Sequence, residues 1–158
     1  MNLNGSELRQ LTFAPTNNQD PIWSPDGRYI AYISDQANTP AHYILDLQTG
    51  ESRRLETGVS LIGGRSDWSP DGQWLAFYAG SQNRRQIYMV HINTLEVRQL
   101  TANNSSNLAP SFSPDGQWIT YTSYVDGDGE IFIMRVDGSE QKQLTFNNRP
   151  DWQPRWQR

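Results

Sequence analysis

The chain has 158 residues, a formal net charge of −4 at neutral pH and no cysteine. The acidic balance argues against a general nucleic-acid binder, which needs clustered Lys and Arg to contact phosphates, and the lack of cysteine excludes disulfides and cysteine-bound metal. No apolar run reaches the ~18 residues of a membrane span, and residues 1–5 do not form a signal peptide. Six Trp, seven Tyr, twelve Gly and nine Pro in a polar chain are typical of many short strands joined by turns.

One motif, an aromatic residue followed by Ser-Pro-Asp-Gly, repeats along the chain. It occupies 23–27, 68–72 and 112–116, and we interpret 152–154, Trp-Gln-Pro, as the start of a fourth copy. The aspartates of the complete copies are 44 or 45 residues apart. A constant period of this length indicates one supersecondary unit used repeatedly.

Each repeat predicts four antiparallel strands in chain order. In the first repeat a short strand at 21–23 carries the aromatic residue, and Pro, Asp and Gly then form a tight turn. An alternating strand at 29–34 follows, then a third at 43–45 and a fourth that ends at 54–55. The same order returns in the second repeat, at 74–78 and 87–90, and in the third, at 118–123 and 131–134.

Four antiparallel strands every ~44 residues, with no helix between them, are the pattern of a propeller blade. The prediction is therefore an all-β half-propeller, a single unit over 1–158, with three full blades at about 20–57, 64–101 and 108–145. The segments 7–12 and 150–154 are predicted to be end strands, because 5–13 matches 138–146 at seven of nine positions.

At Pro-x-Trp-Ser-Pro-Asp-Gly and Gln-Leu-Thr the sequence resembles the TolB-type propeller repeat, which occurs in the periplasmic protein TolB and in propeller domains of some prolyl-oligopeptidase-type peptidases. The resemblance implies a non-enzymatic scaffold that binds a protein or peptide at its channel face, in the periplasm or outside the cell. Two alternatives stay open: an accessory domain of a peptidase, and a structural fragment that self-assembles into a closed ring.

The sequence gives no catalytic, metal or cofactor site. The motif aspartates Asp26, Asp71 and Asp115 are a whole blade apart, so turn stabilisation is the expected role. The run at 126–130 is similar to a calcium loop but lacks the EF-hand ligand order. His42 and His91 fall at different places in their blades, which argues against a shared zinc.

Binding is expected on the loops around the channel mouth, which differ between repeats. The residues three before each motif aromatic should lie near the inner rim, because the first strand of a blade is nearest the axis. We therefore expect Asp20, Arg65 and Arg149 to contact a bound protein or peptide, with Ala109 at the corresponding place in the third repeat.

An arc of three blades leaves two blade faces uncovered. Such faces favour a partner, and two copies placed head to tail would supply six full blades. We expect a homodimer whose contacts include Leu8, Leu11 and Trp152. The alternative is that the chain is a fragment of a longer propeller.

Overall fold

The computed structural model of the chain describes residues 6–125 and 127–157. It contains three four-stranded antiparallel sheets, each with its strands in sequence order. No helix occurs within the described part of the chain. The strands of the first sheet are β1 (Asn18–Trp23), β2 (Tyr29–Ser34), β3 (Ala41–Asp46) and β4 (Ser52–Arg54). Those of the second are β5 (Asp67–Trp68), β6 (Trp74–Ala79), β7 (Gln86–His91) and β8 (Val97–Gln99), and those of the third β9 (Asn107–Phe112), β10 (Trp118–Ser123), β11 (Glu130–Arg135) and β12 (Lys142–Gln143).

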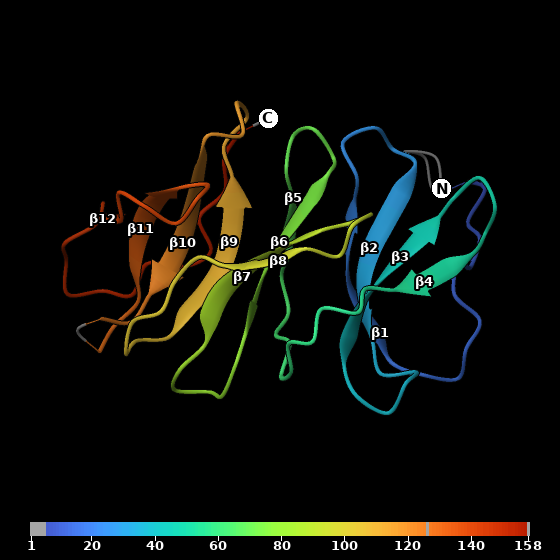
Figure 1. Cartoon of the computed structure of the whole chain (residues 1–158), viewed down its shortest axis with the longest axis horizontal. Coiled ribbons are helices and arrows are strands. Elements are labelled where there is room, and N and C mark those ends of the chain that lie inside the picture. Colours follow the sequence, from blue (N-terminus) through green and yellow to red (C-terminus); the bar gives the residue numbers. More distant parts are fainter. Residues whose placement is uncertain (1–5, 126, 158) are drawn as a thin grey trace.

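The three sheets lie side by side in chain order, with the second in the middle (Figure 1). The inner strand β5 contacts the inner strands β1 and β9, so the three sheets are consecutive blades around one axis. This arrangement confirms the all-β architecture with three blades of four strands.

The Ser-Pro-Asp-Gly turn is built in the same way in all three blades. In the first blade, Asp26 Oδ1 accepts a hydrogen bond from the Arg28 amide at 3.0 Å, and Ser24 Oγ accepts one from the Tyr29 amide at 2.8 Å. The Ser24 hydroxyl also donates to Asp26, and this bond is the main reason that the pKa of Asp26 lies below its usual value. Gly27 adopts a φ of 71°, in the left-handed region that glycine tolerates. The motif aspartates are thus turn residues, as predicted.

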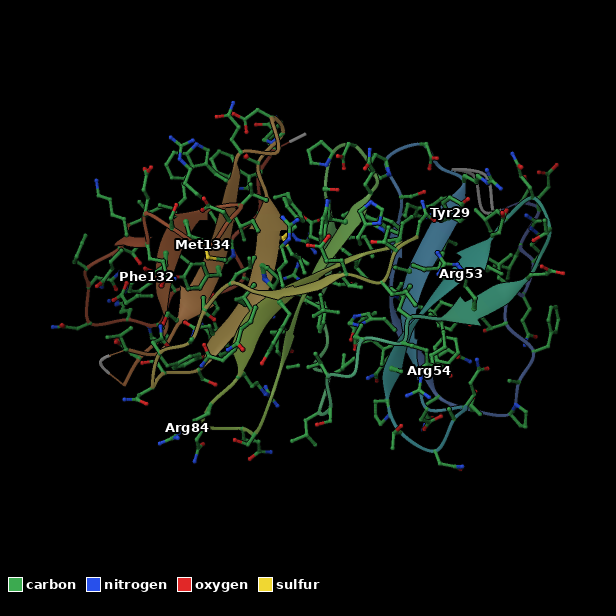
Figure 2. The ribbon with its side chains drawn as sticks, viewed as in Figure 1. Tyr29, Arg53, Arg54, Arg84, Phe132 and Met134 are labelled. Atoms are coloured by element: carbon green, nitrogen blue, oxygen red, sulfur yellow. The ribbon has the colours of Figure 1, made fainter. Side chains whose placement is uncertain are left out.

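Each pair of neighbouring blades shares an apolar core. Between blades one and two, Leu55 from the end of the first blade and Trp68 from β5 belong to one buried cluster, 1% and 0% exposed. Between blades two and three, Leu100 and Phe112 occupy the corresponding places, 5% and 2% exposed. Figure 2 labels Phe132 on the third blade, which packs against this second cluster. Blade–blade packing therefore buries the motif aromatic and the Leu of Gln-Leu-Thr together.

The chain's own N-terminal segment contacts the first blade on the face away from the second blade, through one side chain. Leu11 packs against a buried cluster that includes Tyr32 and Tyr43, and Gln10 Nε2 donates to the Thr12 carbonyl at 2.6 Å. The same Gln-to-Thr hydrogen bond closes blades two and three, where Gln99 and Gln143 donate to Thr101 and Thr145. Residues 10–12 therefore have the local conformation of a blade's last strand.

The structure differs from the prediction at the chain's ends, because neither 7–12 nor 150–154 forms a strand. A strand needs a neighbour whose backbone groups it can bond. The described residues offer no adjacent third strand to 7–12 and no adjacent second strand to 150–154. The two segments have the local conformation of blade strands but lack the backbone pairing of a sheet.

Candidate functional site

The inner strands carry a bulge at the residues that the sequence places at the channel mouth. The pairing register shifts in β1 between Gln19 and Ile22, and at the matching place in β9. Asp20, Arg65 and Ala109 have φ values of 52°, 49° and 50°, which non-glycine residues rarely adopt. Bulges re-aim side chains and are frequent beside functional sites. The repeated strain marks one structurally equivalent position in the three blades.

The fourth copy of this position is Gln153, whereas the sequence predicts Arg149. Gln153 has a φ of 55°, and Trp156 follows three residues later as the motif aromatic does elsewhere. The spacing from Phe112 to Trp156 is 44 residues, equal to the spacing from Trp68 to Phe112. The sequence contains this spacing, but it also contains Trp-Gln-Pro at Trp152, which resembles Trp-Ser-Pro and predicts a position four residues too early.

The equivalent positions surround a cavity of about 250 Å³ beside the inner strands of the three blades. Arg65 donates a hydrogen bond to Gln153 Oε1, which links the second blade to the C-terminal segment. The Gln153 amide donates to Thr122 Oγ1 on β10 at 2.9 Å, which fixes that segment against the third blade. The remaining lining residues are mostly aromatic or apolar: Tyr78, Tyr124, Trp152 and Leu108, together with Gly64 and Thr122.

Two opposite charges from different blades define the electrostatics of this cavity. The Asp20 carboxylate lies against Gly64, where a Cβ would come within 2.5 Å of Asp20 Oδ2. Partial burial, and then the nearby Arg155, lower the pKa of Arg65, while Asp20 acts in the opposite direction. Arg155 itself pairs with the buried Asp67 at 3.3 Å. The cavity thus presents a guanidinium and a carboxylate beside an indole, Trp152, that is 64% exposed.

The predicted site residues divide into two groups in the structure. Asp20 and Arg65 are brought together at the cavity, and Trp152, expected at a self-contact, lines it as well. Arg149 is exposed outside the cavity lining, and its amide donates to Asn147 Oδ1 at 2.8 Å. Leu8 is 79% exposed at the N-terminal end.

The other residues considered from the sequence, His42, His91 and Glu130, lie outside the lining of this cavity. Among residues 6–125 and 127–157, no group of three His, Asp or Glu side chains is placed to hold a metal ion. The calcium-like run includes Asp126, which lies outside the described residues, and its Glu130 is buried and accepts hydrogen bonds from Thr145 and Asn147. His42 is buried between blades one and two, edge-on to Phe77.

A larger cavity of about 670 Å³ lies toward the loops that join β2 to β3 and β6 to β7. Its lining includes Arg54, Arg85 and the exposed Leu61, and none of the residues predicted to bind a partner. Among the residues that the structure describes, there is no candidate for a membrane-spanning helix.

Three consecutive meander sheets with a cavity at the inner rim define a β-propeller scaffold. The family model for the TolB beta propeller domain matches residues 21–158. The chain belongs to the TolB beta propeller family.

Curated relatives match short stretches of the chain. The Tol-Pal system protein TolB of Chromobacterium violaceum is 52% identical over 33 residues, which are 21% of this chain and 8% of that protein. The uncharacterized peptidase YuxL of Bacillus subtilis is 44% identical over 45 residues, 28% of this chain and 7% of that protein. These matches cover about one repeat.

Solved structures match over nearly the whole chain. TolB from Acinetobacter baumannii superimposes with a TM-score of 0.80 at 25% identity, over 97% of this chain and 38% of that one. A puromycin-hydrolyzing peptidase from Mycobacterium tuberculosis gives a TM-score of 0.70 at 19% identity, over 85% of this chain and 23% of that one, and shows the fold alone. The chain therefore spans well under half the length of either protein.

Proposed function

We propose that the chain is a non-enzymatic propeller scaffold that binds a protein or peptide at the channel-mouth cavity, in a periplasmic or extracellular setting. The observation that carries the proposal is the convergence of Asp20, Arg65, Gln153 and the exposed Trp152 on one cavity. Trp, Tyr and Arg are the side chains that contribute most of the binding energy at protein interfaces. The similarity to TolB proteins of Tol-Pal systems supports the same setting.

The size of the cavity favours a peptide side chain over a free small molecule. Pockets for drug-sized ligands usually enclose about 300–1,000 Å³, and this cavity encloses about 250 Å³. Arg65 and Asp20 can each pair with an opposite charge, and Trp152 can cover an apolar side chain. The motif carboxylates are engaged in turns, which supports a binding role over acid–base catalysis.

A displayed random-peptide library, selected on the immobilised full chain, tests this proposal. Selected peptides should bind Arg65→Ala and Trp152→Ala about tenfold more weakly than the unaltered chain, a change of about 1.4 kcal/mol. Arg149→Ala is the matched control, because Arg149 is an exposed arginine outside the cavity lining. Equal affinity of the selected peptides for all variants would show that they bind elsewhere.

The match to YuxL favours a second candidate, an accessory propeller domain of a peptidase. In that role the channel mouth would admit or exclude substrates of a catalytic domain. A peptidase domain encoded in the same gene, together with faster cleavage of large proteins after widening of the cavity by Arg65→Ala, would support it.

We also propose that the chain self-associates. Leu8, 79% exposed, and the half-buried Leu11 lie at one end of the arc, and Trp152 lies in the C-terminal segment. Exposed apolar side chains gathered at the two ends favour contact with another copy.

A further inference from the structure

The last strand of the first blade departs from the repeat. The second and third blades end in Gln-Leu-Thr, at 99–101 and 143–145, whereas the first has Arg-Leu-Glu at 54–56. The three places are structurally equivalent, because the amide of each Leu donates to the carbonyl of the second residue of the third strand in its own blade. In the second and third blades the Gln side chain donates to the Thr carbonyl two residues later. The first blade has a guanidinium group in place of this amide and a carboxylate in place of the hydroxyl.

A second departure lies at the first residue of the third strand. This residue is Gln86 in the second blade and Glu130 in the third, and both side chains are buried. Gln86 Nε2 donates to the Asn103 carbonyl at 3.0 Å. Glu130 accepts a hydrogen bond from the Asn147 amide at 3.2 Å. Each side chain thus holds the segment that follows its blade, whereas the first blade has Ala41 at this place, which ends in a methyl group.

These departures meet at the cavity of about 670 Å³, which is called the side cavity below. The first blade also has Gly58 three residues after its motif Leu, where the other two blades have Asn. Ala41, Arg54, Glu56 and Gly58 all line the side cavity. Differences between copies of one repeated scaffold are where a binding function is expected. The first blade is therefore altered at the residues that open this cavity.

Two guanidinium groups reach the side cavity from different blades. Arg54 lies on β4 of the first blade (Figure 2), and Arg85 comes directly before β7 of the second. In both side chains Nε is buried and has no hydrogen-bond partner among the described residues. Glu56 is exposed, and its Oε1 lies 3.6 Å from Arg54 Nε, beyond hydrogen-bond distance. Buried donors without an acceptor are rare, so both arginines remain available to an anion.

The rest of the lining includes an apolar wall. Val59, Leu61 and Ile62 belong to the segment that joins the first blade to the second. The Gly80 amide donates to the Leu61 carbonyl at 3.1 Å, and Ile62 pairs with Ala79 as an isolated bridge. These backbone bonds fix the wall to the end of β6. Leu61 is exposed and has a φ of 56°, which a non-glycine residue rarely adopts.

We propose that the side cavity is a second binding site, for a small organic monocarboxylate with an apolar body. Arg54 and Arg85 bind the carboxylate, because the planar guanidinium group matches its two oxygens. The apolar wall covers the body of the ligand. The volume falls within the ~300–1,000 Å³ of pockets for small ligands. Two guanidinium groups and one carboxylate in the lining favour a single negative charge on the ligand. This site goes beyond the peptide binding proposed for the cavity lined by Arg65.

NMR titration of the isotope-labelled full chain tests the inference. The probes are 3-phenylpropionate and 2-naphthoate, each compared with its primary amide, which keeps the shape and lacks the charge. Both acids should bind and shift the amide resonances of the side cavity, and each amide should bind about tenfold more weakly. Inorganic phosphate lacks the apolar body and 3-phenylpropylamine has the opposite charge, so both should bind more weakly than the acids.

Substitutions in the lining separate carboxylate recognition from a general effect of charge. Arg54→Gln and Arg85→Gln should each raise the dissociation constants of the acids about tenfold and leave those of the amides nearly unchanged. Arg84→Gln is the matched control, because Arg84 is exposed and lies outside the lining. Glu56→Gln should lower the dissociation constants of the acids about threefold, because it removes a carboxylate beside Arg54. Ala41→Gln supplies the side chain of the second blade and should weaken acids and amides alike by filling the cavity.

Several results would overturn the inference. Acids that do not bind at about 10 mM would do so, as would amides or phosphate that bind as tightly as the acids. Tighter binding of the amine, lost in Glu56→Gln, would show a site for cations. An equal effect of Arg84→Gln and Arg85→Gln would show that only surface charge matters.

The test also distinguishes this site from the one proposed for peptides. Arg65→Ala should leave the binding of both acids unchanged, because Arg65 lies outside the lining of the side cavity. If Arg65→Ala abolishes it, the acids bind in the other cavity and the present inference fails. Peptide selection on the same chain decides the proposed function separately, so either site can be refuted while the other stands.

Discussion

The buried histidine between blades one and two should make the stability of the chain depend on pH. His42 is fully buried on β3, and neither ring nitrogen has a hydrogen-bond partner. Burial lowers its pKa from 6.5 to about 4, because the charged imidazolium is poorly solvated there. The other two blades carry Ile87 and Ile131 at this place, and the carbonyls of all three residues accept the same hydrogen bond from the Leu of the last strand. His42→Ile is thus a substitution that the fold already accommodates.

The sign of the effect follows from the direction of the pKa shift. The folded state keeps His42 neutral. The stability of the folded state is therefore unaffected by this group above pH 6.5, the pKa of histidine in the unfolded chain, and it decreases as the pH falls toward 4, the pKa in the folded chain. Between pH 7 and pH 5 the free energy of unfolding should fall by about 2 kcal/mol from this group. The carboxylates with lowered pKa, such as Asp26 and Asp115, titrate below 3.8 and act outside this window.

Urea unfolding followed by tryptophan fluorescence at pH 7, 6 and 5 measures the effect. The unaltered chain should lose stability across this range, and His42→Ile should lose about 2 kcal/mol less. His42→Ile should also be more stable at pH 7 by roughly 1 kcal/mol or more, because two unpaired buried nitrogens are removed. If both chains lose the same free energy between pH 7 and 5, the reasoning on His42 is refuted.

Three further predictions concern packing and turns. Trp68→Ala should cost about 3–5 kcal/mol of unfolding free energy, and Trp23→Ala under about 1 kcal/mol, because only Trp68 is buried. Equal costs of the two variants in chemical denaturation would contradict the packing of the blades. Gly63→Ala places a Cβ in a steric clash with the Tyr78 ring and should cost about 1–3 kcal/mol of unfolding free energy. Tyr78→Val should relieve this loss in a double-mutant cycle, and a loss that stays the same would contradict the clash. Ser69→Ala removes the acceptor for the Trp74 amide and should lower stability by about 1 kcal/mol; an unchanged melting temperature would show that the hydroxyl is dispensable.

Much of the blade was predictable because its signals are local. The Ser-Pro-Asp-Gly turn is determined by a few consecutive residues, since Asp26 and Ser24 bond to backbone groups only two to five positions away. The alternating strands and the constant period then indicated the meander and the number of blades. Strand order also indicated that Asp20 and Arg65 lie close together, as they do at one cavity, because the first strand of a blade is the one nearest the axis.

Tertiary structure decided which side chains are buried and which residue of the C-terminal segment takes the bulge position. Trp23 and Trp68 have the same local sequence, yet one is 57% exposed and the other fully buried, because burial depends on a neighbouring blade and not on the motif. The sequence did not indicate that Gln153 lines the cavity. Its place there depends on its left-handed backbone conformation and on a hydrogen bond to Arg65, which is 88 residues away in the chain. The sequence by itself determined the repeating unit, and only the packing of blades on one another decided which copies of a residue are core, which line the cavity and which stay exposed.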